Sequence, residues 1–160
     1  MTIQLPQCQQ MGSKKFYSFA EKVIDLRKKY IGNEIDIDEI WNNLISCSKD
    51  INGLGTVYLI TILYFITKGN KPIYDRYAMA SLSVLKLHKL HNDIKVCKDS
   101  IIRGWNLPLK SEINDGIILE KDSIYGQYCS LLEEFFPNNK WKDRDVDRAL
   151  WVYGHYFRVV

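Results

Sequence analysis

The segment from Ile51 to Asp75 holds the residues whose types and spacing could do chemistry. It opens with an apolar residue and a Gly-x-Gly turn, Gly53-Leu54-Gly55, placed between two apolar helical patterns. Glycine lets the backbone turn with a positive φ and approach another molecule closely. The first N–H groups of the helix that follows have no intrahelical acceptor and lie at the positive end of its dipole. Such amides can bind a phosphate oxygen without reading a base, so the segment predicts an anion-binding turn.

A carboxylate follows this turn after one apolar stretch. Asp75 lies 22 residues beyond Gly53, at the end of the run Pro72-Ile73-Tyr74-Asp75. Because the chain turns back past the apolar helix, we expect Asp75 to reach the region of the hairpin. Asp75 also stands where a helix N-cap belongs, and the two roles are compatible.

Taken together, the Gly-x-Gly turn, the apolar stretch 56–67 and the segment 72–75 resemble the helix–hairpin–helix DNA glycosylase superfamily. Within that superfamily the chain looks most like the 8-oxoguanine DNA glycosylase-like proteins. Its members share an apolar-Pro-Gly-Val-Gly hairpin, a buried helix and a Pro-x-x-Asp-type segment with the catalytic aspartate. The resemblance covers about residues 40–85, and the run 144–151 is similar to the C-terminal helix of small bacterial members.

The resemblance implies a base-excising DNA N-glycosylase that binds duplex DNA largely through its phosphates. Asp75 would be the catalytic carboxylate, which stabilises the oxocarbenium-like sugar or orients the attacking nucleophile. A monovalent cation on the hairpin carbonyls would be the one possible cofactor, and no metal site is expected. The target base would have to be flipped out of the duplex. The DNA-binding residues would be Asn52, Gly53, Leu54, Gly55, Thr56 and Val57.

Aromatic residues suit a pocket for a flipped base, because they stack on its faces. With four Trp and ten Tyr in one chain, most must instead belong to the core. The candidates for a base contact are Trp41, Trp105, Tyr125, Trp151 and Tyr153.

The chain departs from the superfamily pattern in several places. Members that also cleave the strand carry a nucleophilic lysine two residues after the second hairpin glycine, where this chain has Val57. Without that amine, Schiff-base chemistry lacks its nucleophile, and neither Lys49 nor Lys68 matches the position. Asn52 replaces the hairpin proline, and no iron–sulfur cysteine set follows. The expectation is a monofunctional glycosylase, or a fold kept for binding alone.

The elements that must position these residues are helical. Apolar residues repeat at three- and four-residue spacing from Phe16 to about Tyr30, and Gly32-Asn33 ends that helix. Asp36 or Asp38 caps a second helix, Thr56 to Thr67 forms an apolar and therefore central third, and Asp75 caps a fourth. Asp122 and Asp143 open the last two. The pattern of residues 87–121 predicts short helices and loops.

Sustained alternation of the kind that marks strands is absent, so we expect an all-α, glycosylase-like fold. A length of 160 residues fits one domain over 1–160, with the hairpin and the aspartate within about 38–86.

Composition excludes several other classes of protein. The longest apolar run, residues 57–66, is too short to cross a bilayer, and the N-terminus lacks a signal pattern. We therefore expect a cytoplasmic protein with no membrane partner. The cysteines are 39, 50 and 32 residues apart, which fits neither a disulfide scaffold nor a zinc site. His88 and His91 lack a third metal ligand with suitable spacing.

Two further functions stay open beside the enzyme. A net charge of +3 argues little by itself, although basic residues crowd the N-terminal and middle segments. A non-catalytic DNA-binding module of the same fold would keep the salt-sensitive backbone contact alone. A helical protein-interaction domain would have no role for nucleic acid, and its glycines would form an ordinary turn.

Overall fold

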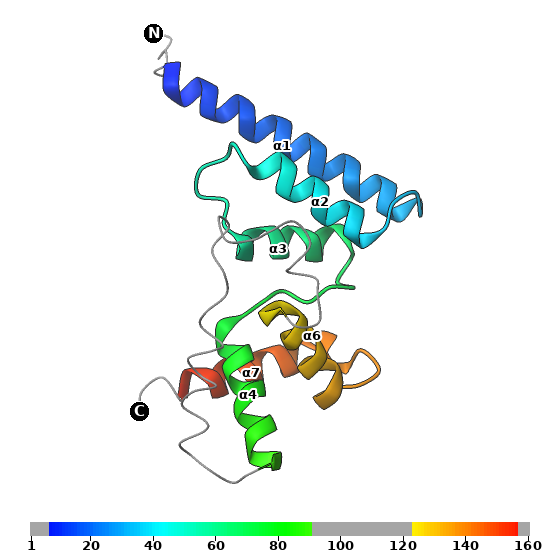
Figure 1. Ribbon diagram of the computed structural model, residues 1–160, viewed down its shortest axis with the longest axis vertical. Helices are drawn as coiled ribbons and strands as arrows, with labels where there is room; N and C mark the ends of the chain where they lie inside the picture. Colours follow the sequence, from blue (N-terminus) through cyan, green and yellow to red (C-terminus); the bar gives the residue numbers. More distant parts are fainter. Residues whose placement is uncertain (1–6, 91–122, 157–160) are drawn as a thin grey trace. The chain divides into compact units, whose positions relative to one another are not determined.

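The computed structural model describes residues 7–90 and 123–156 (Figure 1). These residues hold six α-helices, one short 3₁₀ helix and no strand, which confirms the predicted all-α class. None of the described helices is both long and apolar enough to span a membrane. The chain divides into two compact units, residues 1–70 and 71–160, and each is described by itself. The single domain and the glycosylase-like arrangement stay predictions.

The first unit begins with α1, Gln7–Ile31, which starts earlier than the periodicity from Phe16 predicted. Its last carbonyls are satisfied by the turn that follows, where the N–H of Gly32 donates to Lys28 and that of Glu34 to Lys29. The residue in the left-handed region is Asn33, with φ 59°, and not its neighbour Gly32. The helix therefore ends at the predicted dipeptide, and Asn33, not Gly32, adopts the left-handed conformation that ends it.

Helix α2, Ile37–Ser48, has Asp36 as its N-cap, one of the two predicted caps. The Glu39 N–H donates to Asp36 Oδ1 at 2.8 Å, which satisfies one of the amides that the first turn leaves without a partner. The helix packs by one face, since four apolar side chains of α2 are buried: Ile40, Trp41, Leu44 and Ile45.

Helix α3, Thr56–Ile66, agrees with the predicted apolar helix to within a residue. Its buried face consists of Leu59, Ile60, Leu63 and Ile66. The expectation that α3 is central holds for that face alone, because Val57, Tyr58 and Phe65 on the rest of the helix are exposed. Apolar composition alone did not reveal that only one side of this helix has neighbours in the first unit.

The three helices of the first unit pack against one another (Figure 1). Arg27 of α1 donates through Nη1 to the Phe65 carbonyl at 3.0 Å, so a cation meets the negative end of the α3 dipole. Asn70 Nδ2 donates to the Tyr30 hydroxyl at 2.9 Å. These two contacts fix the C-terminal ends of α1 and α3 beside each other.

The second unit holds α4, Arg76–Leu90; α6, Ile124–Phe135; the 3₁₀ helix η3, Lys140–Lys142; and α7, Arg144–Tyr156. Ser123 caps α6 through its hydroxyl, which accepts from the Gly126 N–H; the predicted opening residue Asp122 lies outside the described residues. Most of the segment predicted as short helices and loops also lies outside them, and its first residues belong to α4. The turn after α6 places Asn138 and Asn139 in the left-handed region.

Helices α4 and α7 cross in direct backbone contact. A Cβ added to Gly154 would overlap the Tyr77 carbonyl oxygen, so only glycine fits there. One turn further along the contact, the buried Ser81 hydroxyl donates to the Leu150 carbonyl at 2.6 Å. Tyr125 of α6 adds a third link, because its hydroxyl donates to the Pro72 carbonyl at 2.7 Å. These contacts fix the start of α4, and with it the position of Asp75 in this unit.

Candidate functional site

The predicted hairpin is an exposed turn between α2 and α3. Gly53 has φ +84°, a left-handed conformation that strains any residue with a Cβ, as the sequence predicted for one of the glycines. The N–H of Gly55 donates to the Gly53 carbonyl at 3.1 Å, which closes the turn tightly. A Cβ added at either glycine would meet nothing within 4 Å. The turn is therefore open to solvent on the side that these glycines face.

The N-terminus of α3 follows the turn directly. Gly55 is the N-cap and has an extended backbone, but no side chain to accept from the first amides of the helix. The N–H groups of Thr56, Val57 and Tyr58 precede the first intrahelical bond, which the Leu59 N–H makes to the Gly55 carbonyl. Three amides at the positive end of a helix dipole thus lack the cap that Asp36 and Ser123 give α2 and α6. This arrangement can hold an anion.

The side chains around the hairpin add little charge of their own. Lys49 and Asp50 are both exposed and opposite in sign, so the positive potential comes mainly from the helix end. Thr56 is buried, and its Oγ1 has no hydrogen-bond partner among the described residues. Val57 is exposed, so the position that the resemblance assigns to a lyase lysine has an apolar side chain. No amine is available there for Schiff-base chemistry.

Asp75 is the N-cap of α4, as the sequence predicted. Its Oδ1 accepts from the Tyr77 N–H at 2.7 Å and from the Ala78 N–H at 3.0 Å. The residue as a whole is half-buried. The hairpin belongs to the first unit and Asp75 to the second, and the predicted approach of one to the other stays a prediction.

A second carboxylate interacts with Asp75. Desolvation, followed by the negative charge of Asp75, raises the pKa of Asp147 above its ordinary value, and Arg144 opposes that shift. Burial, and then the charges of Asp147 and Asp75, raises the pKa of Tyr128 well above its usual value. This pair could not be predicted from the sequence, because 72 residues separate the two aspartates and Asp147 has the spacing of a solvated helix face.

Two buried tyrosines line the same part of the second unit. The rings of Tyr74 and Tyr128 meet edge to face with centroids 5.3 Å apart. Burial also raises the pKa of the nearby Cys129 thiol to about 11, so this cysteine is a poor nucleophile at neutral pH. The described thiols, Cys47 and Cys129, are both free.

The five aromatic candidates for a base pocket have different surroundings. Trp41 and Tyr125 are fully buried core residues, so they present no face to a ligand. Trp151 is exposed but lies against His155, with ring centroids 3.8 Å apart, and His155 stacks in turn on Tyr77 at 3.5 Å. Trp105 lies outside the described residues. Tyr153 lines a groove.

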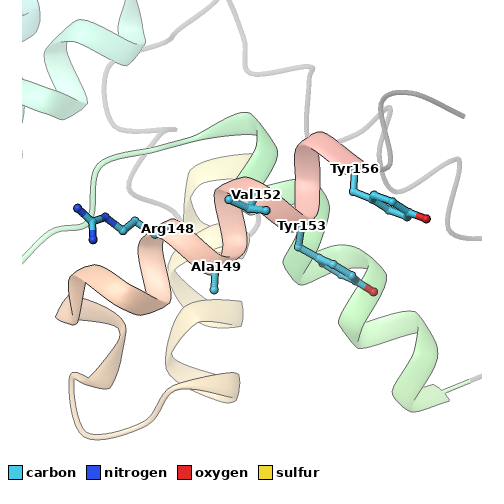
Figure 2. Close-up of a pocket in the computed structure, with 5 residues that line it drawn as sticks. All are labelled: Arg148, Ala149, Val152, Tyr153 and Tyr156. Atoms are coloured by element: carbon cyan, nitrogen blue, oxygen red, sulfur yellow. The ribbon is translucent and has the colours of Figure 1, made fainter.

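That groove runs along the outer side of α7 and has a volume of about 590 Å³ (Figure 2). Its described lining is Arg148, Ala149, Val152, Tyr153 and Tyr156. Figure 2 shows Tyr153 and Tyr156 projecting from one end of the helix and Arg148 from the other. Asp75 is not among the described residues of this lining, so the groove and the aspartate do not form one pocket there.

No metal centre occurs in residues 7–90 and 123–156, where no three His, Cys, Asp or Glu side chains gather closely enough to hold an ion. His88 is exposed at the end of α4, and His91 lies outside the described residues. Comparison of the sequence and structure with protein-family models, curated proteins and solved structures gave no match.

Proposed function

We propose that the chain is a DNA N-glycosylase-like protein that binds the DNA backbone through the hairpin 52–57. The observation that carries the proposal is the uncapped N-terminus of α3 behind the open turn at Gly53. A phosphate oxygen would accept from the amides of Thr56, Val57 and Tyr58, and the helix dipole would favour its charge. Such a contact is independent of base sequence and sensitive to salt.

Gly55→Ser tests this contact without disturbing the fold. The backbone of Gly55 is extended and the space around its Cα is open, so a side chain fits there. Serine is a better N-cap than glycine by a few tenths of a kcal/mol. The new hydroxyl would accept a hydrogen bond from a first-turn N–H group of α3, which would then be less available to a phosphate. We expect unchanged or slightly higher stability, and affinity for a short duplex roughly tenfold lower by fluorescence anisotropy at low salt.

Gly32→Ser is the matched control, because Gly32 lies in the exposed turn at the other end of α2. It makes the same chemical change, and it should leave duplex affinity as it is in the original chain. Equal affinity of the Gly55→Ser and original proteins would show that the α3 amides do not hold DNA.

For catalysis we propose Asp75 as the carboxylate that stabilises the oxocarbenium-like sugar. Asp75→Asn keeps an oxygen that can accept from the Tyr77 and Ala78 amides, so stability should change by less than about 1 kcal/mol. Excision from duplexes with oxidised, deaminated or alkylated bases should be lost, as read by strand breakage after alkali. With Val57 in place of a lysine, no breakage is expected before alkali.

Asp143→Asn is the control for this experiment, because Asp143 also accepts a backbone amide, that of Asp145 at 3.0 Å, in the first turn of α7. This variant should keep the activity of the original chain. If the original chain releases no more base than Asp75→Asn from any duplex of the panel, the catalytic proposal fails.

A non-catalytic DNA-binding module is the second candidate, and two observations favour it. The Oδ1 of Asp75 is already occupied by two α4 amides, and Asp75 is absent from the described lining of the groove on α7. This candidate predicts that duplex binding survives Asp75→Asn and that no base is released. Both candidates share the hairpin contact, so Gly55→Ser weakens DNA binding in either case.

A further inference from the structure

The outward face of α1 carries apolar side chains in a strict seven-residue repeat. Tyr17, Ile24 and Ile31 are 70%, 55% and 48% exposed, whereas Phe19 and Leu26 on the opposite face are 5% and 2% exposed. A seven-residue step returns to the same side of an α-helix within about 20°. A helix that packs by one face normally has polar residues on the other. The outward stripe of α1 is therefore a second apolar face.

Charged residues with the same repeat flank this stripe. Lys14, Glu21 and Lys28 form a column beside it, and all three are exposed. Among the described residues, Glu21 and Lys28 take part in no ion pair. Asp25, which lies next to this column on the helix, is 3.2 Å from Lys29 and 3.9 Å from Lys22, further from the stripe. The column beside the apolar stripe thus alternates in sign and is not neutralised within the first unit.

The length of α1 also indicates a missing neighbour. At 1.5 Å per residue, its 25 residues span about 37 Å, roughly twice the length of the 12-residue α2 or the 11-residue α3. Figure 1 shows its N-terminal part running past the end of α2. Residues 14–18 are exposed on every side, Phe16 and Tyr17 included. Helical segments gain most of their stability from tertiary packing, which this part of α1 lacks in the first unit.

We propose that the outward stripe of α1 pairs with the same stripe of a second copy of the chain, in antiparallel orientation. A two-fold axis at Ile24 brings Tyr17 of one copy against Ile31 of the other. The same axis brings Glu21 beside Lys28 of the second copy, so the flanking column is self-complementary. A parallel pairing would place the columns of the two copies on opposite sides of the interface, so Glu21 and Lys28 would not meet. Charge complementarity therefore selects the antiparallel arrangement.

The pairing is weak, because three apolar side chains from each copy make a small interface. Contacts of this size fall below the range of permanent dimers, and a dissociation constant on the order of 10–100 µM is expected. This inference rests on α1 alone and is independent of the proposed DNA contact at the N-terminus of α3.

An anionic membrane is the other class of partner that a basic helix with exposed aromatic residues can bind. The position of Glu21 argues against it, because this acid lies beside Ile24 in the middle of the outward face. An interfacial helix also needs no seven-residue repeat. A second α1 accounts for both the position of Glu21 and the repeat, so we infer that a second copy covers the stripe.

Sedimentation equilibrium of the full chain, from low micromolar to several hundred micromolar, tests the pairing. The original chain should change from monomer to dimer over that range. Ile24→Glu should remain monomeric at every concentration, with an unchanged far-UV circular dichroism spectrum. Ser18→Glu is the matched control, because Ser18 is exposed on α1 but lies off the stripe; it should dimerise like the original chain.

Charge exchange tests the orientation. In the antiparallel pair, Glu21→Lys alone and Lys28→Glu alone should each weaken the dimer at least tenfold, since each places like charges in contact. An equimolar mixture of the two variants should recover dimers close to the original affinity, because every lysine of the first variant then meets a glutamate of the second.

A parallel pair would give a different pattern, because the columns of the two copies would lie on opposite sides of the interface. Neither single variant would then dimerise tenfold more weakly than the original chain, and the mixture would dimerise no more tightly than either variant alone. That pattern would overturn the antiparallel orientation.

Three results would overturn the pairing itself. The first is a monomer at all concentrations; the second is an Ile24→Glu protein that dimerises as the original chain does. The third is binding of the original chain, lost in Ile24→Glu, to vesicles of mixed phosphatidylcholine and phosphatidylserine without self-association, which would assign the stripe to a membrane surface.

Discussion

At the scale of single residues, Asp75 and Asp147 show how one carboxylate alters another. Asp75 accepts two α4 amides, and its negative charge adds to the desolvation that disfavours ionised Asp147. Asp147 also lies in the first turn of α7, where the helix dipole favours a negative charge. The raised pKa of Asp147 means that desolvation and repulsion outweigh the dipole.

This balance predicts how stability changes with pH. A carboxyl whose folded pKa is raised contributes stability below its unfolded pKa of 3.8, and the contribution is lost as pH rises through the folded value. Asp147→Asn should therefore raise the free energy of unfolding at pH 7. The gain should be less than about 1 kcal/mol, because Asp147 is largely exposed and solvent screens its charge. Urea unfolding at pH 7 and pH 3 measures it, and the difference should vanish at pH 3.

Asp145→Asn serves as the comparison, since Asp145 is exposed and lies 3.9 Å from Arg148. Its removal should leave stability unchanged or slightly lower at pH 7. A gain from Asp147→Asn that is equally large at both pH values would contradict the electrostatic origin of the effect.

At the scale of elements, the contact between α4 and α7 depends on the absence of one side chain. A methyl group on Gly154 would overlap the carbonyl of Tyr77, and neither backbone can move without separating the helices. Gly154→Ala should lower the free energy of unfolding by about 3 kcal/mol, as overpacking of a rigid contact does. Urea unfolding followed by circular dichroism measures this change in the free energy of unfolding.

The sign of the change makes this prediction decisive. At an unconstrained helical site, glycine to alanine raises stability by about 1 kcal/mol. Ala149→Gly, on the groove side of the same helix, supplies the reverse change where no neighbour is crowded, and it should cost about that amount. A more stable Gly154→Ala protein would mean that α4 and α7 do not touch at this point.

Element boundaries could be predicted where a local chemical rule applies. Periodicity located α2 and α3, and Asp36 and Asp75 cap the helices that were assigned to them. Periodicity underestimated α1, because its first turns lack the apolar spacing on which the prediction depended. The apolar composition of α3 predicted a central helix, but composition says which residues are apolar and not how many neighbours surround them.

At the scale of the whole chain, less of the candidate site could be predicted. The positive φ of Gly53 and the free amides of α3 follow from local sequence, and both were expected. The interaction of Asp75 with Asp147, and the close approach of Gly154 to Tyr77, depend on residues more than seventy positions apart. No local pattern encodes such contacts, because they arise when distant helices pack.

The bond between the Ser81 hydroxyl and the Leu150 carbonyl also has a consequence for the order in which the chain folds. It joins residues 69 positions apart, whereas the Arg27–Phe65 contact joins residues 38 apart. Closing a longer loop costs more conformational entropy. During synthesis, α4 cannot pack against α7 before α7 has left the ribosome. Pulsed hydrogen exchange during refolding should therefore protect amides of α2 and α3 before those of α4. Until α7 arrives, the face of α4 that holds Tyr77 and Ser81 lacks its packing partner, and this is the interval in which a nascent chain most needs a chaperone.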